Sequence, residues 1–85
     1  MDCSVAAFVN GRRIVLEMSG TTYDRFLDRR IRLRVTAAEM FEAMIDGGFI
    51  SFGVQPGEDA VPRFLNWLDA NGVRELPLGI RQNHP

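Results

Sequence analysis

Three arginines alternate with three apolar residues in the segment RRIRLRV, residues 29–35. In an extended strand, side chains two positions apart point the same way, about 6.5–7 Å from one another. An extended conformation would therefore place three guanidinium groups on one face, contributed by Arg30, Arg32 and Arg34. A planar guanidinium binds a carboxylate or a phosphate through two parallel hydrogen bonds. The spacing predicts a surface that recognises acidic side chains or phosphate groups.

This arginine row has three interpretations. Charged side chains keep an exposed edge strand soluble and unpaired. The row could instead dock the acidic surface of a protein partner, or a second copy of the chain as a homodimer, because an edge strand can pair with its own copy. It could also bind the phosphates of a nucleic acid. Arg13 lies on the partly polar, solvent-facing side of a predicted hairpin and would enlarge the positive surface. Glu17 on the same side could neutralise part of it.

Charge and composition favour the protein partner over the nucleic acid. The formal net charge is −1 and the sequence pI is about 5.7, whereas a dedicated nucleic-acid-binding domain is usually basic. No aromatic residue lies within the arginine row, so bases would have no ring there on which to stack. All ten basic residues are arginine, which favours a GC-rich genome over selection for bidentate recognition of carboxylate or phosphate. We therefore predict a non-enzymatic bacterial interaction or regulatory protein.

Residues suited to catalysis are few. His84 is the only histidine and lies one residue from the C-terminus, where packed neighbours seldom hold a general base in place. Cys3 falls on the apolar face of a predicted strand and is interpreted as a small buried hydrophobic residue. These two residues alone cannot make a structural zinc site, which usually has four ligands, and no glycine-rich phosphate-binding motif occurs. We expect no enzyme activity, no cofactor and no metal.

The arginine row needs a sheet to position it, and the clearest part of that sheet is a hairpin. Two apolar runs flank Asn10–Gly11, which is the strongest short-range signal for a two-residue β-turn. Such a turn pairs Val9 with Arg12 and Val5 with Leu16. One face of the hairpin is then nearly all apolar and the other is mixed, as in a sheet that covers a core on one side.

Helices and further extended segments are predicted after the hairpin. The best-supported helix covers residues 37–46, where Thr36 and Glu39 match a capping box. The other predicted elements are a helix over 21–30 capped by Thr21 or Thr22, strands over 30–35 and 49–54, a helix that begins at Asp59, and an extended segment over 73–80. For residues 30–35 a continuing helix is the alternative, but it would scatter the three arginines around its axis and separate Leu33 from Ile31.

Together these elements predict a small two-layer α+β domain. The order is β-β-α-β-α-β-α-β, with a mixed sheet of four or five strands and two or three helices packed mainly on one face. The domain is expected over residues 1–80, followed by a frayed tail over 81–85. A single cysteine excludes an intramolecular disulfide. Without a signal-like or membrane-spanning apolar segment, we expect a cytoplasmic protein with no membrane partner.

Overall fold

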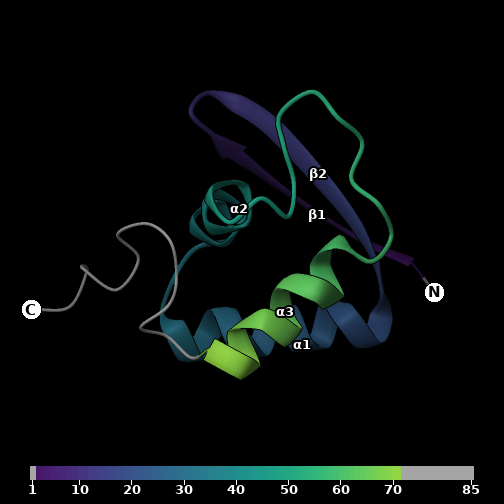
Figure 1. Ribbon diagram of the computed structural model, residues 1–85, viewed down its shortest axis with the longest axis vertical. Helices are drawn as coiled ribbons and strands as arrows, with labels where there is room; N and C mark the ends of the chain where they lie inside the picture. The colour runs from purple at the N-terminus through teal and green to yellow at the C-terminus, as the bar shows by residue number, and fades with distance from the viewer. Residues whose placement is uncertain (1, 72–85) are drawn as a thin grey trace, which may run out of the picture.

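The computed structural model describes residues 2–71, and within that range it is an α+β fold with a two-stranded antiparallel sheet and three helices (Figure 1). The predicted extended segment over 73–80 and the predicted tail over 81–85 lie outside the described residues. The elements are β1 (Asp2–Val9), β2 (Arg12–Ser19), α1 (Gly20–Leu33), α2 (Ala37–Asp46) and α3 (Ala60–Asn71).

The hairpin forms as predicted. Asn10 and Gly11 both have positive φ angles, 53° and 78°, which is the conformation of a type I′ turn. The register pairs Val9 with Arg12 and Val5 with Leu16, as the turn length requires. The α+β class and this register are therefore confirmed.

The two faces of the hairpin differ as the alternation of residues predicts. The inner face carries Val9, Leu16 and Met18, all of them buried in the core. The outer face is exposed along its whole length, and it includes Phe8, which is 66% exposed. The outer face of this sheet is therefore uncovered within the described part of the chain.

Helix α1 begins earlier and ends later than the sequence predicts. Ser19 is its N-cap and accepts a hydrogen bond from the backbone N–H of Thr22. The helix runs on to Leu33, and Arg34 ends it in the left-handed conformation with φ 58°. The predicted strand over 30–35 is therefore wrong.

The physical reason for this error is that Leu33 belongs to a helical pattern. It lies seven positions after Phe26, which is fully buried, so both face the core from the same side of the helix. Ile31, which a strand would have turned inward, is 66% exposed. The alternation of arginine with apolar residues has the two-residue period of a strand. Of Ile31 and Leu33, however, only Leu33 packs on the core.

Helix α2 confirms the capping box. The backbone N–H of Glu39 donates to the Thr36 hydroxyl at 3.1 Å, and the backbone N–H of Thr36 donates to the Glu39 carboxylate at 2.9 Å. The helix ends at Gly47, and Gly48 follows with φ 81°, the left-handed conformation expected of a glycine there. α2 lies against β1 and so covers part of the inner face of the hairpin.

A loop replaces the predicted strand over 49–54. The backbone N–H groups of Phe49 and Ile50 donate to the carbonyl of Met44, so the chain turns back on α2 instead of extending. With residues 30–33 helical and Arg34 ending the helix, a strand here would also have no parallel neighbour. The predicted sheet of four or five strands is therefore not present within residues 2–71, where the sheet has two strands.

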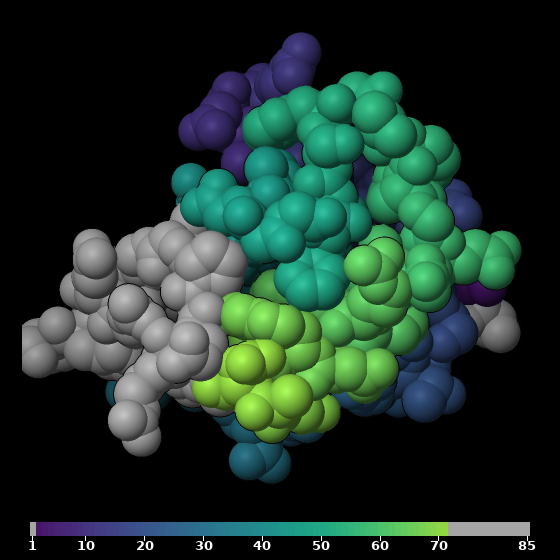
Figure 2. Space-filling model, viewed as in Figure 1, coloured from purple at the N-terminus to yellow at the C-terminus, as the bar shows by residue number. Residues whose placement is uncertain are grey.

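The core lies between the inner face of the hairpin and the three helices. Its largest fully buried side chains are aromatic or long aliphatic: Phe26, Phe41, Phe64, Leu16, Met40, Met44 and Leu65. α3 contributes through Phe64, whose ring lies 5.3 Å from that of Phe49. α2, the loop and α3 form one continuous face, and the hairpin lies largely behind them, with its turn protruding at the top (Figure 2).

Candidate functional site

The structure does not gather the predicted arginine row on one face. Arg32 donates to Asp28 on its own helix at 2.9 Å, and Arg30 donates to the carbonyl of Val35 at 3.2 Å. Residues two apart on a helix point about 200° apart around its axis, because one turn takes 3.6 residues. Arg34 lies at the helix end in a left-handed conformation. The face on which these three residues were predicted to act together does not exist.

Other arginines of α1 hold that helix to α3. Arg25 and Arg29 both pair with Asp69, at 3.3 Å and 2.8 Å. Arg29 also pairs with Asp28 at 2.6 Å. Because these guanidiniums already have carboxylate partners, α1 presents less free positive charge than its sequence suggests.

Arg34 is a non-glycine residue in a conformation that glycine adopts more readily. We expect Arg34→Gly to raise the free energy of unfolding by about 0.5–1 kcal/mol, because it removes the steric cost of the left-handed conformation. Thermal unfolding followed by circular dichroism should show a melting temperature several degrees higher. The matched control, Arg32→Gly in the last turn of α1, also removes the ion pair with Asp28 and should lower stability by up to about 1 kcal/mol. A loss of stability in both variants would contradict the assignment of Arg34 as a left-handed residue that ends α1.

Arg13, the fourth predicted binding residue, lies in a different setting. Together with Arg12 it lines a groove between β2 and the loop after α2, which we call the β2 groove. Its cavity volume is about 390 Å³. The groove is lined by residues 12–16 of β2 and residues 50–56 of the loop.

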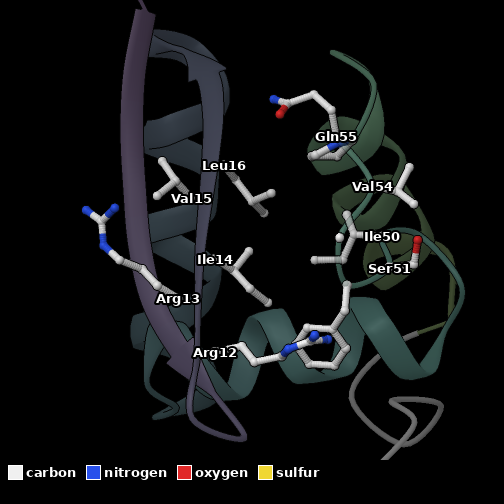
Figure 3. Close-up of a pocket in the computed structure, with 12 residues that line it drawn as sticks. Arg12, Arg13, Ile14, Val15, Leu16, Ile50, Ser51, Val54 and Gln55 are labelled. Carbon is white, nitrogen blue, oxygen red and sulfur yellow. The ribbon is translucent and has the colours of Figure 1, made fainter.

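The side chains of β2 alternate across the groove (Figure 3). Ile14 and Leu16 point toward the loop that carries Ile50, whereas Arg13 and Val15 point to the other side of the strand. Arg12 lies over the ring of Phe52, with its guanidinium carbon 5.1 Å from the ring centre. The groove therefore has an apolar floor and a cationic end near the hairpin turn.

The backbone of β2 is open along this groove. In a two-residue hairpin the residues that flank the turn form a hydrogen-bonded pair, and hydrogen-bonded pairs then alternate with non-hydrogen-bonded ones. The register therefore turns the N–H and C=O groups of Arg13, Val15 and Glu17 away from β1. No backbone hydrogen bond joins these three residues to another segment within residues 2–71.

The charge along this edge changes sign from one end to the other. Arg12 and Arg13 lie at the turn, are exposed, and take part in none of the ion pairs found among the described residues. At the far end Glu17 and Glu58 line an adjoining cavity of about 270 Å³. β2 therefore presents an open strand edge that is positive at one end and negative at the other.

Sequence reasoning found one residue of this site and missed the rest. Arg13 was placed correctly on the outer face, because the turn fixes the register. Arg12 lies on the inner face with Val9, as the register predicts, but the sequence does not predict that it lies exposed over Phe52. The sequence signal for the loop that lines the groove is Gly53. Its φ angle is 76°, a conformation that glycine adopts readily and that a regular strand does not contain.

Groups that could support other chemistry are sparse in the described part of the chain. Within residues 2–71 no cluster of histidine, cysteine or acidic side chains could hold a metal ion. None of the three helices there has the length and apolar character to cross a membrane. Cys3 is partly buried on the inner face, paired in register with Met18, and His84 lies outside the described residues.

Comparison of the chain with protein-family models, with curated proteins and with solved structures found no match.

Proposed function

We propose that the chain is a non-enzymatic protein-interaction module that binds, along the edge of β2, an extended protein segment with an acidic side chain opposite Arg13. The observation that carries this proposal is the row of outward N–H and C=O groups at Arg13, Val15 and Glu17, beside the β2 groove. An extended segment added to such an edge completes the hydrogen bonds of the strand, and pockets beside the edge select its side chains.

The groove supplies the selection. Alternate side chains of an added strand would enter between Ile14 and Leu16 on one side and Ile50 on the other. The side chains on the opposite face would align with Arg13, which is exposed and has no ion-pair partner among the described residues. This arrangement supports recognition of alternating apolar residues, with an acidic side chain on the opposite face at the position next to Arg13.

The same two arginines, Arg12 and Arg13, could contact phosphates, but the rest of the edge does not favour a nucleic acid. Glu17 and Glu58 lie at its far end and would repel a phosphate backbone that followed the strand. At the cationic end Phe52 is covered by Arg12, which leaves the exposed Phe8, opposite Arg13, as the ring on which a base could stack. An extended protein segment is therefore the better fit.

The experiment uses a labelled peptide of alternating valine and threonine in which the residue placed opposite Arg13 is glutamate, called the valine–glutamate peptide. It is titrated with the full chain and followed by fluorescence anisotropy. Binding should be about tenfold tighter than for the matching valine–lysine peptide, which has lysine at that position, because Arg13 attracts the glutamate by up to about 1 kcal/mol and repels the lysine by a similar amount. Val15→Pro should abolish binding, because proline removes the outward N–H at the centre of the edge.

Ala6→Pro is the matched control. Ala6 lies directly opposite Val15 in a non-hydrogen-bonded pair, so its N–H points to the edge of β1 instead. Both variants should lose a similar, small amount of stability, and only Val15→Pro should lose the peptide. Equal binding in both variants would overturn the proposal. A labelled thymidine oligonucleotide that bound while the valine–glutamate peptide did not would favour nucleic-acid binding instead.

A further inference from the structure

The charges on the outer face of β2 are arranged symmetrically about one residue. Arg13 and Glu17 each lie two positions from Val15, one on either side. All three side chains are on the exposed outer face, and all three residues turn their backbone groups outward. An antiparallel copy of the same edge, centred on Val15, therefore places a glutamate opposite Arg13 and an arginine opposite Glu17.

From this arrangement we infer that the occupant of the β2 edge is β2 of a second copy of the chain, related by a two-fold axis at Val15. The inference rests on the proposed function and identifies its partner. Directly opposite residues in an antiparallel pair have their side chains on the same face. Arg13 of one copy then lies opposite Glu17 of the other, twice, and the two Val15 side chains meet at the axis.

This pairing satisfies every open group on the edge. Three hydrogen-bonded pairs would give about six backbone hydrogen bonds, because each such pair exchanges two. On the inner face the half-buried Ile14 of one copy would lie opposite the buried Leu16 of the other, and Arg12 opposite Met18, so no two like charges face each other there. The result is a four-stranded antiparallel sheet in the order β1-β2-β2-β1.

Charge selects this register over its neighbours. Moving the two-fold axis to Ile14 would place Arg13 opposite Val15 and carry Glu17 past the end of the partner strand. Moving the axis to Leu16 would place Glu17 opposite Val15 and Arg13 opposite Ser19. Both shifts lose the two opposite-charge pairs, which each stabilise a sheet relative to uncharged neighbours. The two-fold axis at Val15 is the register that keeps them.

The test is the mass of the full chain in solution, measured by sedimentation equilibrium at increasing concentration. The wild-type chain should reach twice the chain mass. Arg13→Glu and Glu17→Arg each convert two attractive pairs into two repulsive ones, and each should weaken the dimer at least about tenfold. The double variant R13E/E17R restores opposite charges in the reverse order and should dimerise within about threefold of the wild-type chain. It has the same net charge and composition as the wild type, so it is the matched control.

Three results would overturn this inference: a monomer at all concentrations up to about 1 mM, the weak end of protein association; a dimer that survives both single reversals; or a double variant as weak as the single ones. Circular dichroism spectra that match the wild type show that a lost dimer is not a lost fold. A monomer that still binds the valine–glutamate peptide, and loses it in Val15→Pro, would overturn the dimer while leaving the proposed function standing. A chain that neither dimerises nor binds the peptide would overturn both.

Discussion

Replacing Phe26 with alanine is expected to lower the free energy of unfolding by about 3–5 kcal/mol. Phe26 is fully buried on α1, and its ring lies 6.0 Å from that of Phe41 on α2 at an interplanar angle of 53°. Truncation removes the buried apolar surface and leaves a cavity that rigid neighbours fill only in part. Urea unfolding followed by circular dichroism measures the change.

This loss is a large fraction of the stability of so small a domain, which is of the order of 5–10 kcal/mol. The matched control is Phe8→Ala on the outer face of β1, where the side chain is 66% exposed. That change should alter the free energy of unfolding by no more than about 0.5 kcal/mol. Similar losses in the two variants would mean that α1 does not pack on α2 as described.

Local rules predicted the hairpin and α2 because each is specified by residues a few positions apart. Asn10 and Gly11 tolerate the positive φ angles of the turn, and the turn length then fixes every pair along the strands. Thr36 and Glu39 satisfy each other's backbone groups across three residues. Neither element needs the rest of the fold to be recognised.

The arginine segment failed because two periods compete there. Residues 30–35 alternate strictly, yet Leu33 also continues the helical face begun by Phe26. Packing on the core decides between the two periods. Burial of an apolar side chain such as Leu33 stabilises the helix more than the alternating pattern alone stabilises a strand. The pairing of Asp28 with Arg32 across one helical turn adds to the helix and was visible in the sequence.

The loop after α2 failed for a different reason. Its apolar residues Phe49, Ile50 and Phe52 look like a buried strand, but each packs on a different neighbour. Ile50 is buried in the core, Phe49 lies against the rings of α3, and Phe52 lies under Arg12. Such contacts depend on where distant elements lie. For the same reason the sequence located Arg13 on its face but could not reveal the groove or the open edge beside it.

Leu16→Asp is expected to unfold the domain, with a loss of more than about 4 kcal/mol. Leu16 is 1% exposed and faces the core from β2. The variant loses the buried leucine and must also either bury an unpaired carboxylate or keep it protonated, and both alternatives disfavour the folded state. Far-ultraviolet circular dichroism and urea unfolding at neutral pH should show a chain without a cooperative transition.

Val15→Asp is the control that makes the result specific to one face. Val15 is the preceding residue on the same strand and its side chain is 36% exposed on the outer face. Aspartate there should cost about 1 kcal/mol, the difference in strand preference between the two residues. Because a slip of one residue would exchange the two faces of β2, the opposite order of losses would show that the strand pairs in another register. That register would also move Arg13 and Glu17 to the inner face. This pair of variants therefore tests the strand register on which the proposed docking edge depends.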